Sequence, residues 1–213
     1  GAGGHAAAIQ ERTAPDGRLL GIDQDAAALE LVRETLAPWT DRTVIIRTNF
    51  SEVAQAARAE GFLGVDGVIA DLGVSSMMLD EADRGFSFRM DGPLDMRMDR
   101  RQRTSAADLV NTGTERQLAD TIYRLGGERR SRPIARSIFR SRPHETTGDL
   151  VRAIEAVSGR PRFGRIHPAT RTFMALRIAV NQELESLEGF LDGVIETLRS
   201  GGRLVVISFH SLE

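Results

Sequence analysis

Short apolar runs alternate with helix-compatible stretches at both ends of the chain. Four runs have the composition of buried parallel strands: residues 18–23, 43–47, 65–72 and 203–209. Residues 26–36 are typical of a helix, and Ser51 is placed to cap another helix that stops at Gly61. Strands that alternate with helices predict an α/β fold with one parallel sheet covered on both faces.

The middle of the chain lacks such strand-like runs and has short helical patterns instead. Thr114 and Gln117 have the spacing of a capping box, and apolar positions predict further helices over 132–140 and 149–157. The segment is also punctuated by glycine and proline. We therefore expect a helical insertion between two strands of the sheet.

A long apolar stripe follows this helical segment. Apolar residues recur every three or four positions from Phe173 to Leu198, which predicts one long helix packed against the sheet. Together the patterns predict two domains. One is a sheet domain made of residues 1–84 and 169–213, and the other is an inserted helical domain over residues 85–168.

Charge is also distributed unevenly along the chain. All 28 basic residues are arginine, and 20 of them lie between Arg84 and Arg177 together with 10 acidic residues. The rest of the chain holds 8 arginines and 20 acidic residues. Such a split indicates a polyanion-binding part on an acidic scaffold, and the planar guanidinium group suits phosphates and stacking on bases.

Several classes of protein are excluded or disfavoured by composition. The chain has no cysteine, so disulfides, thiolate catalysis and cysteine-ligated zinc are excluded. None of the four histidines has a partner at metal-ligand spacing, so we predict no metal site. There is neither an apolar stretch long enough for a membrane span nor a visible secretory signal, and we expect a cytoplasmic protein without membrane contact.

Polar residues at the ends of the predicted strands form a candidate ligand site. The glycines of GAGGH (residues 1–5) allow close backbone approach to an adenosine-type ligand, and Asp23 follows at the spacing of a ribose-binding acid. Asp71 ends another strand, where it can hold the amino group of a cofactor or of a base. The pattern alone fits either a nicotinamide cofactor or S-adenosylmethionine, although the incomplete G-x-G-x-x-G disfavours the former.

Residues 85–99 form an unusual loop of aromatic, methionine and alternately charged residues without a helix or strand period. Flat apolar side chains next to arginine suit an unstacked nucleobase and its phosphates. The alternative is an ordered loop folded back on the sheet.

Six motifs occur in an order that resembles one known family. They are GAGGH, GIDQD, DLGVSS, RGFSFRMDGPLDMRMD, HPATRTFMALRIAVNQEL and ISFHSLE. The chain resembles, from Gly1 to Glu213, the bacterial 16S ribosomal RNA cytosine-N4 methyltransferase H family, also called MraW. The resemblance implies a class I, Rossmann-like methyltransferase sheet with an inserted helical domain that engages substrate. It further implies S-adenosylmethionine-dependent N4-methylation of a cytidine in the decoding region of 16S ribosomal RNA.

The resemblance also implies roles for individual residues. Gly3, Gly4 and His5 would cradle S-adenosylmethionine, with Asp23 at the ribose, Phe50 beside the adenine and Asp71 in the same pocket. Met77 and Met78 stand where the family usually has Pro-Gln, so one side-chain contact to the cofactor is missing. The family has a strand and Asp-x-Thr before the glycine turn and continues past SFHSLE. We therefore expect an internal fragment, and whether the fragment alone is active is left open.

Methylation of N4 needs an acceptor that hydrogen-bonds the amine, because the nitrogen lone pair is delocalised into the ring. The main candidate is Asp71 or a nearby backbone carbonyl, with Ser75 and His210 as weaker candidates. The cytidine must be unstacked, and Phe86, Phe88 and Arg89 would receive it. Further arginines are expected to contact phosphates: Arg129, Arg130, Arg132, Arg136, Arg140 and Arg142.

The expected partner is 16S ribosomal RNA within the small ribosomal subunit, and a homodimer is left open. Three alternatives stand beside this interpretation. The first is a Rossmann dehydrogenase, and the second is a DNA amino-methyltransferase, whose Asp/Asn-Pro-Pro-aromatic motif is missing where DLGVSS stands. The third is a non-catalytic RNA-binding ribosome assembly factor on a degenerate methyltransferase fold.

Overall fold

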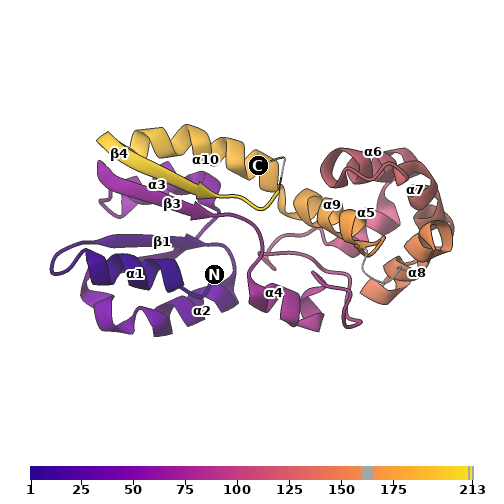
Figure 1. Cartoon of the computed structure of the whole chain (residues 1–213), viewed down its shortest axis with the longest axis horizontal. Coiled ribbons are helices and arrows are strands. Elements are labelled where there is room, and N and C mark those ends of the chain that lie inside the picture. The colour runs from indigo at the N-terminus through magenta and orange to yellow at the C-terminus, as the bar shows by residue number, and fades with distance from the viewer. Residues whose placement is uncertain (160–165, 211, 213) are drawn as a thin grey trace. The chain divides into compact units, whose positions relative to one another are not determined.

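The computed structural model describes residues 1–159, 166–210 and 212. Ser211 and Glu213 of the last motif, and residues 160–165 of the predicted inserted domain, lie outside the described residues. The chain divides into two compact units (Figure 1). Unit 1 consists of Gly1–Ser75 and Leu184–Glu213, and unit 2 of Ser76–Glu183. Unit 2 therefore extends beyond the predicted boundaries of 85 and 168 at both ends.

Unit 1 contains four strands, one in each of the four predicted runs. They are β1 (Leu19–Asp23), β2 (Thr43–Arg47), β3 (Val65–Asp71) and β4 (Leu198–Ile207). β1 pairs in parallel with β2, and β3 pairs in parallel with β4. The chain is therefore an α/β protein with parallel strands.

The prediction of one continuous sheet is wrong for the described residues. The strands form two separate two-stranded sheets, because β1 is hydrogen-bonded to β2 and β3 to β4. β4 also begins at Leu198, ahead of the predicted start at Arg203, so that Gly201 and Gly202 lie inside it. The β3–β4 register shifts between Val65 and Gly67, which accommodates this longer strand.

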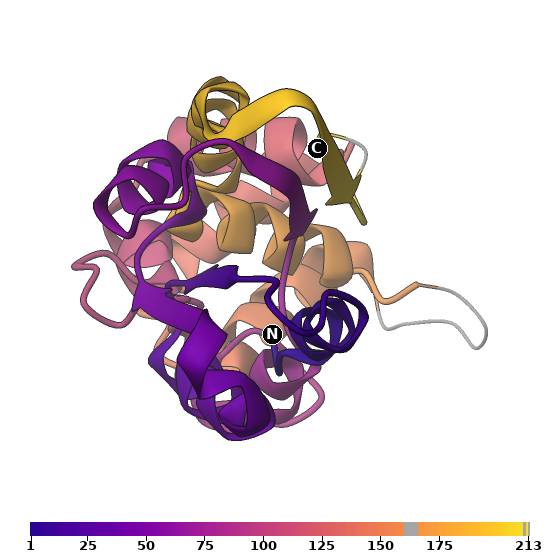
Figure 2. The same cartoon turned by 90° about the vertical axis from the view of Figure 1, so that its left-hand side faces the viewer.

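Helices lie around the strands of unit 1 (Figure 2). They are α1 (Gly4–Arg12), α2 (Ala26–Thr35), the short η1 (Ala37–Arg42) and η2 (Phe50–Glu52), α3 (Val53–Ala59) and α10 (Glu183–Thr197). A hydrophobic core forms where α3 and α10 meet the strands: Val53, Leu187, Phe190 and Val194 are buried against Ile22, Val68 and Ala70. The core thus fixes the strands whose ends carry the candidate ligand site.

The predicted helix cap at Ser51 is wrong. Ser51 lies inside η2, and the side chain of Asn49 accepts its backbone N–H at 2.9 Å. Asn49 caps the segment instead, because its side-chain oxygen can reach the N–H two residues on.

Unit 2 is built from helices. They are α4 (Ser76–Asp80), η3 (Ala82–Arg84), α5 (Ala106–Thr112), α6 (Glu115–Gly126), α7 (Ser131–Arg140), α8 (Thr147–Ser158) and α9 (Thr170–Asn181). The predicted capping box of Thr114 and Gln117 is confirmed at the start of α6. Similar boxes begin α5 and α8, so three helices of this unit have a defined N-terminus.

The predicted long helix from Phe173 to Leu198 is two helices. Gln182 adopts a left-handed conformation with φ of 49°, which ends α9 before α10 begins at Glu183. α9 packs on α5 and α6. Gly126 permits this approach, since a Cβ atom there would clash with the carbonyl oxygen of Arg171. None of the described helices combines the length and apolar character needed to span a bilayer.

Candidate functional site

The carboxyl ends of β1 and β3 place two carboxylates beside the start of α1. β1 ends at Asp23 and β3 ends at Asp71. The amino group of Gly1 lies 2.9 Å from Oδ2 of Asp23, and Nδ1 of His5 lies 3.5 Å from Oδ2 of Asp71. The glycine-rich segment therefore contacts both acids, as its position at the strand ends predicts.

Asp23 is held in place by the turn that follows β1. Its Oδ1 accepts the backbone N–H of Asp25 at 2.9 Å, and its carbonyl oxygen accepts the N–H of Thr48. Asp25 in turn caps α2 by accepting the N–H of Ala27. This network leaves Oδ2 of Asp23 directed at the glycine segment, where it can accept hydrogen bonds from hydroxyl groups.

The start of α1 has the backbone of an anion-binding helix terminus. Gly3 is the N-cap with φ of 85°, a conformation that favours glycine, and no side chain caps the helix. The hydroxyl of Thr35 donates to the carbonyl of Ala2 at 2.9 Å and ties this segment to α2. The first N–H groups of α1 lack carbonyl partners within the helix, so they can bind a carboxylate or another anion.

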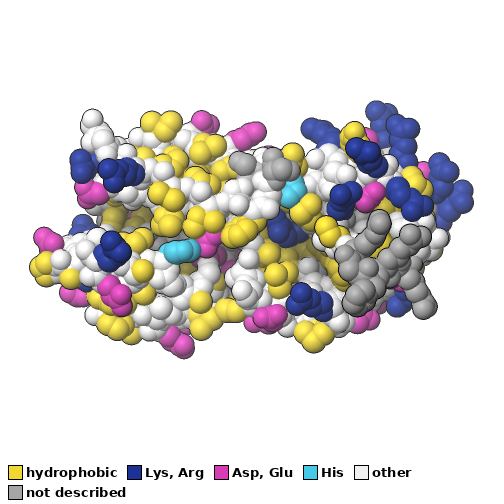
Figure 3. All heavy atoms as spheres, viewed as in Figure 1, with side chains coloured by type: hydrophobic (Ala, Val, Ile, Leu, Met, Phe, Trp, Pro, Cys, Tyr) yellow, Lys and Arg dark blue, Asp and Glu magenta, His cyan; other side chains and the backbone are white. Residues whose placement is uncertain are grey.

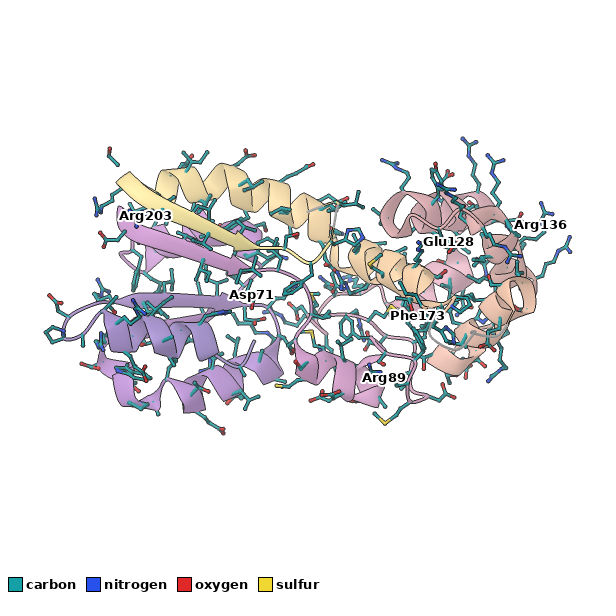
Figure 4. The ribbon with its side chains drawn as sticks, viewed as in Figure 1. Asp71, Arg89, Glu128, Arg136, Phe173 and Arg203 are labelled. Atoms are coloured by element: carbon teal, nitrogen blue, oxygen red, sulfur yellow. The ribbon has the colours of Figure 1, made fainter. Side chains whose placement is uncertain are left out.

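Asp71 is more exposed than the sequence suggests. Its side chain is 49% exposed at the end of β3 (Figure 4), whereas the apolar run before it predicts burial. The strand buries only part of its length, because its other residues alternate between exposed and partly buried positions. The carboxylate of Asp71 is therefore accessible to a ligand.

The loop over residues 85–99 is ordered and packed within unit 2. Leu94, Met96 and Met98 are buried. The side chain of Asn181 on α9 accepts the N–H of Met98 at 2.7 Å and donates to the carbonyl of Met96 at 2.8 Å. Asp91 accepts the N–H of Gly148 at 2.7 Å, which fastens the loop to the start of α8. The loop is thus ordered, and these contacts join it to α9 and α8 of unit 2.

Arginine side chains gather on the surface of unit 2 over α6 and α7 (Figure 3). Arg129, Arg132, Arg136 and Arg140 are exposed. Arg136 extends away from α7 (Figure 4), and its Nε lies 3.2 Å from Oε1 of Glu115. The exposed members of this set can meet a polyanion without first leaving a buried site.

Comparison with known proteins identifies the family. The profile described as the MraW methylase family matches residues 1–213. The chain belongs to the MraW methylase family. It is 51% identical over its whole length to the ribosomal RNA small subunit methyltransferase H of Syntrophobacter fumaroxidans, covering 68% of that protein. It is 52% identical to the protein of the same name from Symbiobacterium thermophilum and 48% identical to that from Desulfotalea psychrophila, covering 68% and 74% of them.

Membership of this methylase family favours methyl transfer over the dehydrogenase alternative, and a methylase requires a methyl donor. The described residues contain no cluster of three or more His, Asp or Glu able to hold a metal ion. S-adenosylmethionine carries a cationic sulfonium, an ammonium, a carboxylate and ribose hydroxyls. Two carboxylates beside an uncapped helix N-terminus match this set of groups, so the residues of unit 1 fit the donor.

Two further residues predicted near the reacting groups lie at the ends of unit 1. Ser75 is partly buried just before α4. His210 follows β4, where its Nδ1 accepts the N–H of Leu212 at 3.2 Å and its carbonyl accepts the hydroxyl of Ser208. These contacts order the turn after β4 and do not in themselves set the imidazole against Asp71.

Phe50 contributes to the core of unit 1. Its ring meets that of Phe190 edge to face, with centroids 5.7 Å apart. Because it is only partly buried, it retains surface beside the strand ends. Met78 is buried in α4, while Met77 is partly exposed.

Among the residues expected to receive a base in this MraW family member, Phe86 is placed differently from the prediction. It is 7% exposed and packs near the guanidinium of Arg84, so its ring offers little surface for stacking. Phe88 is partly buried, with its ring centroid 4.6 Å from that of His167 and 4.8 Å from that of Phe173. Arg89 is exposed. The loop therefore presents Phe88 and Arg89 rather than Phe86.

Two of the arginines expected to contact phosphates, Arg130 and Arg142, donate hydrogen bonds to backbone carbonyls within unit 2. Arg142 donates from Nε to the carbonyl of Val110 at 2.6 Å and from Nη2 to the carbonyl of Gly113. Burial lowers the pKa of its guanidinium. Arg130 donates to the carbonyl of Val157 at 2.6 Å. Carbonyls at the end of α5 therefore take donors of Arg142 that were expected to meet a phosphate.

Sequence reasoning missed Asn181, whose side chain fixes the loop at Met96 and Met98. It is buried on α9 and also donates to the carbonyl of Arg177. A polar amide inside an apolar helical stripe was the available signal, because such a group requires partners when it is buried.

Proposed function

We propose that this protein transfers the methyl group of S-adenosylmethionine to N4 of a cytidine in the decoding region of 16S ribosomal RNA. The names of its relatives, all ribosomal RNA small subunit methyltransferases H, support ribosomal RNA as the substrate. The observation that carries the proposal lies in unit 1, where Asp23 ends β1, Asp71 ends β3 and His5 in the first turn of α1 lies 3.5 Å from Asp71. These are the residue types and positions that an adenosyl methyl donor needs.

Different residues of unit 1 would hold different parts of the donor. Asp23 would accept the ribose hydroxyls, and the N–H groups of Gly4 and His5 would face the donor's carboxylate. Phe50 would lie beside the adenine. When it is bound there, S-adenosylmethionine supplies an electrophilic methyl group.

Asp71 is the candidate acceptor for the N4 amine. A hydrogen bond from the amine to its carboxylate draws the nitrogen lone pair out of conjugation with the ring and makes N4 more nucleophilic. Methylation forms an N–C bond and breaks an S–C bond, and N4 then loses one proton to Asp71 or to water. The exposure of Asp71 leaves its carboxylate open to such a contact.

Unit 2 would bind the RNA. The cytidine has to be unstacked before its amine can be reached, so a single-stranded or opened segment is required. Phe88 and Arg89 would receive the base, because Phe86 is buried. The exposed arginines Arg129, Arg132, Arg136 and Arg140 would contact phosphates.

Substitution at the two ends of β3 tests this proposal. Asp71→Asn should lower the rate of methyl transfer at least tenfold, since an amide is a weaker acceptor than a carboxylate. Asp66→Asn is the matched control, because Asp66 lies near the start of the same strand, is 87% exposed and pairs with Arg199. Calorimetry should show that Asp66→Asn binds S-adenosylmethionine with wild-type affinity. A methyl-transfer assay on small ribosomal subunits should show that it also keeps the wild-type rate. Wild-type turnover by the Asp71 variant would remove this residue from the mechanism, and absence of donor binding by the wild-type protein would refute the proposal.

A further inference from the structure

The exposed surface of α7 carries one aromatic residue, Phe139, beside several arginines. The inward face is Ser131, Ile134, Ala135 and Ile138, all buried. Phe139 lies at the edge of this face, one turn after Ala135, and its side chain is 43% exposed. With 3.6 residues per turn, Phe139 shares a face with Arg132, seven residues before it, and Arg136, three residues before it. Arg140, the next residue along the helix, is also exposed.

The ring of Phe139 is backed by a cation. The guanidinium carbon of Arg142 lies 4.5 Å from the ring centroid. Arg142 is itself held by the carbonyls of Val110 and Gly113. A side chain anchored at two points loses little further freedom on binding, so the ring is presented in a defined orientation. The exposed part of the ring is available to a planar partner.

The positive charge of α7 favours a negatively charged partner. α7 contains no acidic residue, and the nearest acidic contact of its arginines is Glu115 at Arg136. Arginine interleaved with an exposed aromatic ring is the pattern of surfaces that bind single-stranded nucleic acid, in which phosphates meet the cations and a base stacks on the ring. In a duplex the bases are stacked on one another, so they are not free to stack on an aromatic side chain.

We propose that Phe139 is a stacking platform for a nucleobase of single-stranded ribosomal RNA, and that Arg132, Arg136 and Arg140 bind the phosphates of the same strand. The inference rests on the proposed function, in that it takes ribosomal RNA as the polyanion. It adds a second contact with the RNA strand, separate from the loop that would receive the target cytidine. Phe139 thereby distinguishes single-stranded from double-stranded RNA.

Binding assays with matched variants separate stacking from charge. Phe139→Leu should weaken binding of a 15-nucleotide single-stranded RNA about tenfold and leave the salt dependence unchanged, because stacking releases no counterions. Phe139→Tyr keeps the ring and should retain wild-type affinity. Arg132→Gln, Arg136→Gln and Arg140→Gln together should lower the salt slope by about 2, given about 0.7 for each phosphate contact on a single strand. Arg152→Gln is the control, since Arg152 lies on α8 and pairs with Asp149.

A fluorescent reporter tests contact with the base directly. Trp39 is the single tryptophan of the chain, so Trp39→Phe combined with Phe139→Trp leaves one indole at position 139. The single-stranded RNA should quench its fluorescence, whereas the same sequence as a duplex and polyphosphate should not. Equal quenching by duplex or polyphosphate would overturn the inference, and so would unchanged RNA affinity of Phe139→Leu. Failure of the wild-type protein to bind any RNA would instead overturn the proposed function.

Discussion

Carboxylates at turns organise both units at the scale of single residues. In unit 1, Asp23 and Asp71 end two strands and face the glycine segment. In unit 2, Asp108 and Asp149 cap helices, and Asp91 fastens the loop to α8. Hydrogen bonds from backbone or hydroxyl groups hold the pKa of each of these three acids in unit 2 below its ordinary value. Their charged forms therefore stabilise the folded unit.

Asp91→Asn tests this stabilisation through its dependence on pH. The N–H of Gly148 is the largest cause of the lowered pKa of Asp91. A carboxyl whose pKa is lowered on folding stabilises the fold above its unfolded pKa of about 3.9, and the effect is lost as the pH falls through the folded value. The urea midpoints of wild type and variant should therefore differ at pH 7 and converge below about pH 4. Asp16→Asn, on an exposed turn of unit 1, is the control. A difference that stayed constant with pH would contradict the assignment.

Sequence patterns predict which residues belong to the candidate site better than they predict whether the side chains are buried or exposed. The glycine segment, Asp23 and Asp71 could be placed together because parallel strands end at one edge. The burial of Phe86 and the exposure of Asp71 could not be predicted, because each depends on packing partners distant in sequence. The contacts of Arg142 could not be predicted for the same reason, since the carbonyls that take its donors lie some 30 residues earlier, at the end of α5.

At the scale of elements, α6 packs closely on α9 at Gly126, where one added methyl group would disrupt the contact. Gly126→Ala should destabilise unit 2 by about 1–3 kcal/mol, because the added Cβ meets backbone that cannot move aside cheaply. Gly193→Ala in α10 is the comparison, because its Cβ would come within 3.2 Å of the side chain of Val53, a smaller overlap than the one with backbone at Gly126. Urea unfolding of the three proteins measures the effect. Equal stability of wild type and Gly126→Ala would show that the two helices are not in tight contact.

The elements themselves were largely predictable, and their pairing was not. Apolar runs identified all four strands, and the capping box of Thr114 marked the start of α6. The apolar period continues without interruption across Gln182, so the break between α9 and α10 left no trace in the pattern. The pairing of the strands into two sheets could not be predicted either. A hydrophobic run indicates that a segment is a strand but not which strand it pairs with.

At the scale of the whole molecule, charge follows the division into units. The arginine-rich stretch from Arg84 to Arg177 lies within unit 2, and the acids of the candidate donor site belong to unit 1. The uneven distribution of charge along the chain is therefore enough to indicate two parts. Unit 2 is longer than the predicted inserted domain because it includes residues 76–84 and α9, and the apolar stripe of α9 is also what a helix on a sheet would have.

The most direct test of the account is methyl transfer to small ribosomal subunits followed by nucleoside analysis. The protein expressed from its complete reading frame is incubated with purified subunits and S-adenosylmethionine labelled in its methyl group. The account predicts label in N4-methylcytidine at one position in the decoding region of 16S ribosomal RNA. Absence of label from the RNA, or label in a different nucleoside, would contradict it.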